Sequence, residues 1–198
     1  MITLDSEFIR QRTVDTVLND GSRVRLRPVV PEDKERLVQG LERLSPESRY
    51  RRFMSAVSRI PDRQLRYFTE LDYVDHYAVG ALALDEPGEP GVGVARYVRL
   101  ADQPQVAEVA VTIVDDYQKS GLGSLLLQAA MAVALENGIL EFQAEIMGDN
   151  HGAIRLVRRF GARIVRKGNP CLMSIHLPSA MEALRGTERY ELIRAVAG

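Results

Sequence analysis

A glycine-containing loop between a predicted strand and a predicted helix constrains this chain more than any other feature. The loop reads Gln118-Lys119-Ser120-Gly121-Leu122-Gly123 and follows an apolar run at residues 111–114. An amphipathic helix is expected directly after it, over residues 121–137. Glycines let backbone N–H groups turn inward toward an anion, and a helix N-terminus adds a positive dipole end. The loop therefore predicts a phosphate-binding cradle.

Two other phosphate-binding loops do not fit this stretch. A dinucleotide-binding loop has the pattern G-x-G-x-x-G, and Leu126 stands where its third glycine belongs. A P-loop requires Gly-Lys-Ser or Gly-Lys-Thr, and the chain contains neither tripeptide. The pattern that remains is Q-x-x-G-x-G between a strand and a helix.

The order of the predicted elements around the loop indicates one mixed α/β domain. Asn19-Asp20-Gly21 predicts a hairpin turn, and Pro31, Pro46 and Pro61 predict helix starts. Strands are expected at residues 14–18, 22–27, 77–84, 92–100, 105–114, 140–146, 163–166 and 171–177, with a further helix at 150–160. This order favours a mostly antiparallel sheet flanked by helices, within a domain covering residues 1–178.

Residues 179–198 are expected to form a C-terminal helical extension. Ser179-Ala180-Met181-Glu182 has the pattern of a capping box, and Gly186 interrupts the helix. A spaced apolar set follows the same segment, namely Met181, Leu184, Leu192, Ile193 and Val196. Because such a stripe must be buried, it packs either on its own sheet or on a second subunit. We favour packing near the acceptor cleft or across the interface of a homodimer.

Composition limits the partners and the compartment. The formal net charge is −1, so no general attraction to nucleic acid or an anionic membrane is expected. Cys171 is the single cysteine, which excludes an intrachain disulfide and a four-cysteine zinc site. Neither a signal peptide nor a membrane-spanning apolar run is predicted, so we expect a cytoplasmic protein. His151 and His176 lack acidic or cysteine partners at ligand spacing, so no metal is expected.

The loop, together with Asp115-Asp116-Tyr117 before it and the long helix after it, resembles the coenzyme-A loop of the GNAT superfamily of N-acetyltransferases. The resemblance covers roughly residues 22–177. It implies a GNAT fold and transfer of an acetyl group from acetyl-CoA to a primary amine. It also implies that Gln118 leads into a pyrophosphate site formed by the backbone of Lys119, Ser120, Gly121, Leu122, Gly123 and Ser124.

The same resemblance predicts where the pantetheine arm binds. In GNAT enzymes two central strands splay apart to admit the arm, and here these strands are residues 105–114 and 140–146. The amides of the arm would pair with Val111, Thr112 and Ile113. Residues 150–162 resemble the family pattern N-x-x-A-x-x-L-Y-x-x-x-G-F, which implies that Asn150 lies beside the arm. Val157 replaces the tyrosine of that pattern, so the family's tyrosine acid is absent at this position.

Glu108 is the predicted general base. An amine must be neutral to attack a thioester, and a lysine side chain has a pKa of about 10.4, so a nearby carboxylate is needed. Strand alternation leaves Glu108 as the one acid on a largely apolar strand. The segment 107–112 also resembles the strand of bacterial Pat-type protein-lysine acetyltransferases, where the glutamate is assigned as base. A solvent-facing strand residue is the alternative, and Asp72, Asp75 and His76 are secondary candidates.

Two more stretches resemble the Pat-type group, residues 44–53 and 71–78. Helices in this region form one wall of the acceptor cleft in GNAT folds, so Arg49, Arg51 and Arg52 are expected to meet an acidic acceptor or the 3′-phosphate of coenzyme A. A solvated basic helix face is the alternative. The resemblance favours a protein lysine as acceptor, with a small-molecule amine second. A non-catalytic acyl-CoA-binding module is the alternative that the Val157 replacement leaves open.

Overall fold

The computed structural model describes residues 6–55 and 59–198. The helices are α1 (Ser6–Gln11), α2 (Lys34–Glu42), α3 (Pro46–Phe53), α4 (Asp62–Thr69), α5 (Leu122–Glu136), α6 (His151–Arg158), α7 (Leu177–Glu182) and α8 (Glu188–Ala197), with short 3-10 helices at Pro31–Asp33 and Asp115–Tyr117. The strands are β1 (Val14–Val17), β2 (Arg23–Pro28), β3 (His76–Ala83), β4 (Gly91–Leu100), β5 (Gln103–Ile113), β6 (Glu141–Ile146), β7 (Arg163–Arg166) and β8 (Cys171–His176).

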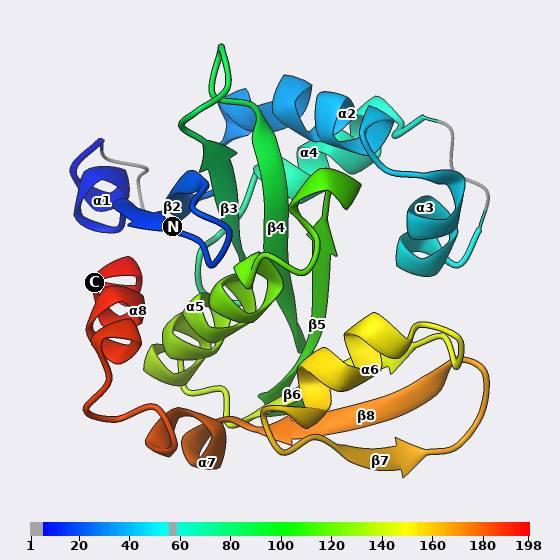
Figure 1. Ribbon diagram of the computed structural model, residues 1–198. Coiled ribbons are helices and arrows are strands. Elements are labelled where there is room, and N and C mark those ends of the chain that lie inside the picture. Colours follow the sequence, from blue (N-terminus) through cyan, green and yellow to red (C-terminus); the bar gives the residue numbers. More distant parts are fainter. Residues whose placement is uncertain (1–5, 56–58) are drawn as a thin grey trace.

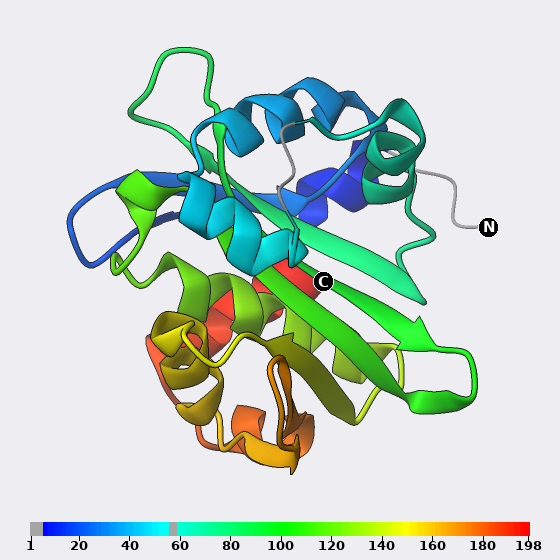
Figure 2. The same ribbon diagram turned by 90° about the vertical axis from the view of Figure 1, so that its right-hand side faces the viewer.

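The strands form a single mixed sheet in the order β1-β2-β3-β4-β5-β6-β8-β7 (Figure 1). Neighbouring strands of the described sheet are antiparallel, apart from the parallel pair β5–β6. Helices cover both faces, with α5 and α8 on one side and α2 and α4 on the other (Figures 1 and 2). The predicted mostly antiparallel sheet flanked by helices is confirmed.

The predicted turn and cap residues form the expected local structures. Gly21 has a φ of +90°, the left-handed conformation that the β1–β2 turn requires. The side chain of Ser45 accepts a hydrogen bond from the backbone N–H of Ser48 at 3.2 Å, and Pro46 is the first residue of α3. Helix α4 begins at Asp62, directly after Pro61. Local sequence is sufficient at these positions because each turn or cap depends on adjacent residues.

Helix α5 is buried on nearly every side, and the prediction of an amphipathic helix is wrong here. Leu122, Leu126 and Met131 are fully buried, but Ser124 and Gln128 are also less than 6% exposed. The reason is that α7 and α8 pack against α5 in addition to the sheet. A helix that is covered both by a sheet and by other helices needs no polar face.

The C-terminal segment packs on its own chain. Ile193 and Val196 are completely buried in the main core, and α8 contacts α5 and β1. None of residues 179–198 lines the large cleft described below. The expected packing near the acceptor cleft is therefore wrong, and the apolar stripe packs within its own chain instead. A dimer interface at this segment stays a prediction. The division at residue 178 remains a prediction.

The predicted capping box at Ser179 is also wrong. Helix α7 begins at Leu177, and the Ser179 hydroxyl contacts Nδ1 of His176 at 2.8 Å. A side-chain cap occurs instead at Thr187, whose hydroxyl oxygen accepts from the backbone N–H of Tyr190 and begins α8. The predicted interruption near Gly186 is confirmed.

Membrane-spanning helices and clustered metal ligands are both absent from the described residues. No helix among residues 6–55 and 59–198 has the length and apolar character that a bilayer crossing requires. No group of three or more His, Cys, Asp and Glu side chains in those ranges is arranged to hold a metal ion.

Candidate active site

The parallel pair β5–β6 separates partway along its length. Pairing covers three positions and ends where Glu108 faces Gln143. Beyond that point β5 stays paired with β4 through Ile113, and β6 stays paired with β8 through Ile146. The edge of β5 that faces β6 is therefore unpaired from Val109 onward, and the predicted splay is confirmed (Figure 2).

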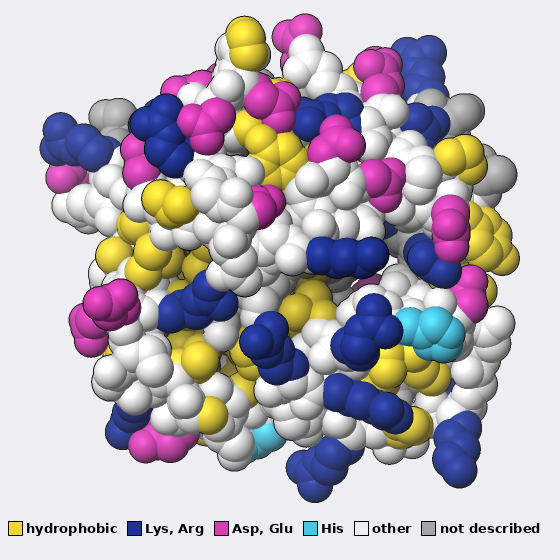
Figure 3. All heavy atoms as spheres, viewed as in Figure 1, with side chains coloured by type: hydrophobic (Ala, Val, Ile, Leu, Met, Phe, Trp, Pro, Cys, Tyr) yellow, Lys and Arg dark blue, Asp and Glu magenta, His cyan; other side chains and the backbone are white. Residues whose placement is uncertain are grey.

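A cleft of about 1140 Å³ occupies the region of this separation. Its walls come from β5, β6, α3, α4, α6 and the loop before α5. Figure 3 shows the surface hollowed on this side, with basic side chains beside the opening. The predicted site residues that line it are Glu108, Val111, Thr112, Ile113, Gln118, Lys119, Gly121, Gly123, Ser124 and Asn150. The structure thus brings together residues that lie up to 42 positions apart.

Ser120 and Leu122 are the predicted site residues whose side chains do not line the cleft. The Leu122 side chain is fully buried in the core. The Ser120 hydroxyl donates a hydrogen bond to the Tyr117 carbonyl at 2.6 Å. Both residues hold the loop in place, so only their backbone remains as a candidate for ligand contact.

The loop backbone has the form of an anion cradle. Lys119 and Gly121 both have positive φ, +65° and +94°. Within the described part of the chain, the backbone N–H groups of Lys119, Ser120 and Gly121 have no acceptor. The Leu122 N–H makes a long contact of 3.4 Å to the Ser120 hydroxyl oxygen. The N–H groups that follow it in the first turn of α5 lack acceptors within the helix. Several free donors at a helix N-terminus fit the pyrophosphate of coenzyme A.

The β1–β2 turn supports this loop, which the sequence did not indicate. The backbone N–H of Asn19 donates to the Ser120 carbonyl at 3.0 Å. A side-chain carbon at position 121 would lie 2.7 Å from Nδ2 of Asn19. Asn19 also lines the cleft. Gly121 is therefore required both by its φ and by the close approach of Asn19.

Asp115 connects the loop to α3. Its carboxylate accepts hydrogen bonds from the Ser45 backbone N–H, the Ser48 hydroxyl and, at 2.7 Å, the Gln118 side chain. Burial acts to raise the pKa of Asp115, but the bonds from Ser48 and Ser45 prevail and keep that pKa below its usual value. The ionised carboxylate thus fixes one wall of the cleft relative to the loop.

Glu108 is exposed in the cleft. It occupies the last position at which β5 pairs with β6. Its carboxylate acts electrostatically on Arg52 of α3, which also lines the cleft. Burial lowers the pKa of Arg52, and the Glu108 carboxylate opposes this shift. No hydrogen bond to Glu108 occurs among the described side chains, so the carboxylate is free to accept a proton from a ligand.

The secondary base candidates lie outside the cleft. One Asp72 oxygen accepts from the backbone N–H groups of Val74, Asp75 and His76, so this residue organises a turn. Asp75 forms an ion pair with Arg99 at 2.6 Å. His76 Nε2 lies 2.6 Å from the guanidinium of Arg96, and burial followed by the Arg96 charge lowers the His76 pKa to about 4.

The three arginines of α3 have different surroundings. Arg49 donates to the carbonyls of Glu42 and Leu44, at the end of α2. Arg51 pairs with Glu47 at 2.6 Å and donates to the Asp149 carbonyl, which connects α3 to the start of α6. Arg52 and Arg51 line the cleft, whereas Arg49 does not. The expected contact with an acidic acceptor or the 3′-phosphate therefore stays a prediction for Arg51 and Arg52 only.

Val157, which stands where the family has its tyrosine, is 5% exposed in the cleft wall and offers no acid there. Tyr117 lines the cleft, but its hydroxyl donates to Glu86, and burial and this contact raise the Tyr117 pKa to about 12. Further lining residues that the sequence did not single out are Phe53, Met54, Gln64, Tyr67, Phe68 and Arg96. Their contribution depends on how α3 and α4 pack over the sheet.

Comparisons with known proteins agree with this geometry. Residues 23–163 match the family model described as "Acetyltransferase (GNAT) domain". The chain is 40% identical over 147 residues to Acetyltransferase Pat of Mycolicibacterium smegmatis, covering 72% of this chain and 42% of that protein. It is 37% identical over 121 residues to Acetyltransferase PA5475 of Pseudomonas aeruginosa, covering 61% of this chain and 64% of that protein. It therefore spans less than two thirds of either relative.

A solved structure matches over most of the fold. The GNAT domain of S. lividans PAT has a TM-score of 0.76 and 31% identity, covering 87% of this chain and 98% of that one. Three observations indicate the same family: the splayed strands, the glycine loop and the match to the family model. The chain belongs to the GNAT family of acetyltransferases.

Proposed function

We propose that this chain transfers an acetyl group from acetyl-CoA to a primary amine, the side chain of a protein lysine. The observation that carries the proposal is the cleft where β5 leaves β6, with free backbone donors at one end and the Glu108 carboxylate at the other. Acyl-CoA is the co-substrate of the family. A thin, amide-bearing arm needs a strand edge with unused hydrogen-bonding groups, and β5 supplies one.

Each part of the co-substrate has a matching part of the cleft. The N–H groups of the loop at 119–124 bind the pyrophosphate. The free edge at Val111, Thr112 and Ile113 pairs with the pantetheine amides. The Asn150 side-chain oxygen accepts from the backbone N–H of Ala153 and caps α6, so Asn150 holds α6 against the arm.

Glu108 acts as the general base. When bound, acetyl-CoA supplies the thioester carbonyl that the amine nitrogen attacks; the carbon–sulfur bond then breaks and coenzyme A leaves as a thiolate, which takes a proton from solvent. Glu108 takes the proton that the nitrogen loses, directly or through one water. No tyrosine is needed as acid, because a thiol has a pKa of about 8.5 and its thiolate leaves readily near neutral pH.

The acceptor side of the cleft suits a lysine presented on a protein. Tyr67 of α4 and Met54, which follows α3, line the cleft and are 51% and 37% exposed. Such side chains pack against the aliphatic stem of a lysine while its amine reaches inward. The resemblance of segments 44–53 and 71–78 to Pat-type enzymes supports the same acceptor.

A turnover screen tests the proposal. Free thiol is followed with acetyl-CoA against one panel of lysine peptides and another of small amines, with Glu108→Gln as the reference for uncatalysed transfer. Turnover with peptides supports the protein-lysine acceptor. Turnover with small amines and none with peptides would show that the acceptor is a small-molecule amine. Tight coenzyme-A binding without any turnover would show that the chain is a binding module.

A further inference from the structure

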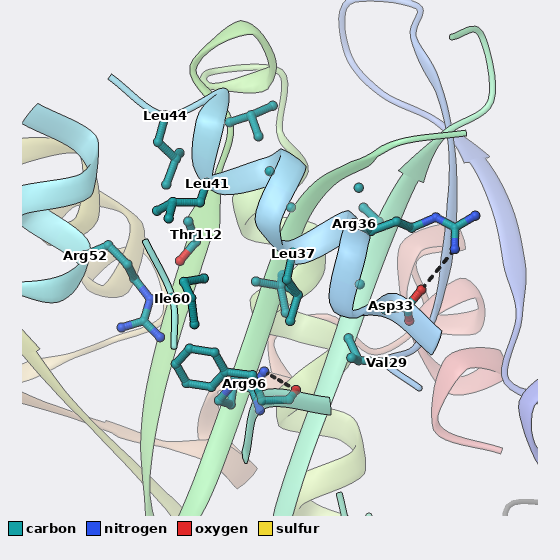
Figure 4. A pocket seen from close by; sticks show the side chains of 18 of the residues that line it. Val29, Asp33, Arg36, Leu37, Leu41, Leu44, Arg52, Ile60, Arg96 and Thr112 are labelled. Atoms are coloured by element: carbon teal, nitrogen blue, oxygen red, sulfur yellow. Dashed lines mark hydrogen bonds and ion pairs between the residues drawn. The ribbon is translucent and has the colours of Figure 1, made fainter. Parts of the chain in front are cut away.

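Two arginines from different elements line the cleft. Arg52 reaches in from α3, and Arg96 rises from β4 (Figure 4). Both also border a small apolar cavity of about 100 Å³ beneath α2. Arg96 is only 7% exposed. The two charges are close enough that the Arg52 charge, after burial, helps to lower the pKa of Arg96 to about 9.

Neither guanidinium is neutralised by an acid within the described ranges. Arg96 donates to the Phe68 carbonyl at 2.7 Å and contacts the neutral His76 ring. Arg52 stacks 5.1 Å from the Phe53 ring and has no hydrogen-bond acceptor among residues 6–55 and 59–198. The nearest acid, Glu108, acts on Arg52 without forming a bonded pair.

A buried arginine elsewhere in this protein shows the usual arrangement. Arg27, with a 13% exposed side chain, pairs with Asp33 through two bonds of 2.6 and 2.7 Å. Arg96 is also buried and has no such partner, which is costly because a buried charge loses its hydration without compensation. Arg52 is half-buried, and its guanidinium N–H groups have no acceptor among the described residues. This part of the cleft therefore has an excess positive charge and unused N–H donors.

The position of this charge relates it to the acceptor. In the register of the sheet, Arg96 faces Ala110 and Val98 faces Glu108. Arg96 thus projects from the same face as Glu108 at a separation of two residues, or about 7 Å along the strand. The pyrophosphate cradle lies beyond Ile113, so along β5 the position of Arg96 falls between Glu108 and the cradle. An amine held at Glu108 therefore has Arg96 about 7 Å away on the same face of the sheet.

We propose that Arg52 and Arg96 form a binding site for a carboxylate carried by the acceptor. The planar guanidinium fork matches a carboxylate through paired, charge-assisted bonds. Two sources offer this group: an Asp or Glu side chain near the acceptor lysine in a protein, and the free α-carboxylate of an amino acid. The inference rests on the proposed function, because it names a feature of the acceptor.

Matched acceptors measure the contribution of the carboxylate. One arm uses lysine peptides that differ by a single Glu or Gln close to the lysine, and the other uses Nα-acetyl-lysine and its amide. We expect kcat/KM to be at least about tenfold higher for the carboxylate member of one pair, since charged hydrogen bonds contribute this much. In Arg52→Gln the two members become equal, and in Arg52→Lys part of the preference remains.

Arg52 is the residue to change, because the more buried Arg96 also holds His76 and Phe68. Arg63→Gln is the control, because this substitution removes the same charge. Arg63 is exposed on α4 and does not line the cleft. This variant should retain the full preference. The inference is overturned if, in the unaltered protein, kcat/KM is the same with and without the carboxylate in each pair of acceptors. It is also overturned if the preference for the carboxylate remains in Arg52→Gln.

A binding measurement separates this inference from the proposed function. Calorimetry follows the same four acceptors with the protein saturated in coenzyme A, where no transfer occurs. Tighter binding of a carboxylate member, lost in Arg52→Gln, supports the site even if the turnover screen fails. Transfer to neutral amines with no such difference in binding supports the proposed function and rejects the carboxylate site.

Discussion

Glu108 and Gln143 form the last pair at which β5 and β6 are joined. The carboxylate therefore lies at the point where the two strands begin to separate and the cleft opens. This position gives it access to a ligand from the cleft while its backbone stays fixed by β4 and β6. A group held at such a junction is well placed to receive a proton from an amine.

Replacing Glu108 with Gln should lower kcat by roughly 10²–10⁴-fold, as is usual for the loss of a general base. Coenzyme-A affinity should be unchanged, because the carboxylate lies away from the loop at 118–124. Steady-state kinetics and calorimetry measure the two effects. Glu141→Gln is the control, since Glu141 is on β6 but does not line the cleft. A Glu108→Gln protein with full activity and the same pH profile excludes Glu108 as the base.

Replacing Gly121 with Val should abolish the thermal stabilisation that acetyl-CoA provides. A side chain there is strained by the φ of +94° and meets Asn19. A ligand that binds only the folded state raises the melting temperature by mass action, so loss of binding removes the shift. Gly138→Val is the matched control, because Gly138 has a φ of +76°, ends the same helix and has open space around it. It should lower stability and keep the shift; equal shifts in both variants contradict the assignment of the loop.

Stability should decrease between pH 6.5 and pH 4 because of His76. Its pKa is about 4 in the folded protein and about 6.5 in the unfolded chain. In that window the unfolded state takes up a proton that the folded state does not, so acidification favours unfolding. Melting temperatures at pH 7, 6 and 5 should fall less in His76→Gln than in the unaltered protein. His151→Gln, an exposed control on α6, should follow the unaltered protein; a parallel fall in all three would rule out His76.

Replacing Ile193 with Ala should reduce the free energy of unfolding by about 2–5 kcal/mol, the usual cost of a large-to-small change in a core. Ile193 is fully buried on α8 against the main core. Chemical denaturation measures the change. Val165→Ala provides the control, since Val165 is 57% exposed on β7. An effect of Ile193→Ala no larger than that of the control would show that α8 is a dispensable layer.

A chain ending at Pro178 should lose stability for the same reason, because it uncovers part of α5. Since no residue of 179–198 lines the cleft, the Michaelis constant for acetyl-CoA should stay the same where the shortened chain folds. Light scattering compares its oligomeric state with that of the full chain. A dimer that becomes a monomer would show that the segment also forms an interface.

The sequence by itself determined the elements that depend on neighbouring residues. Ser45 and Pro46 start α3 and Gly21 forms the β1–β2 turn, because caps and turns are local. The loop at 118–124 was identified for the same reason, since its glycines, the strand before it and the helix after it are contiguous. Family resemblance then predicted the splay of the two central strands.

Only the tertiary structure decided what covers each element and which distant side chains meet. The packing of α7 and α8 against α5 explains why α5 has no polar face, and no local pattern in residues 121–137 reveals it. Arg49, Arg51 and Arg52 look alike in the sequence, yet their partners come from α2, from Asp149 and from the cleft. The surroundings of a charged side chain depend on groups far away in the sequence. Arg52 and Arg96 therefore come to line the same cleft only once α3 packs over the sheet.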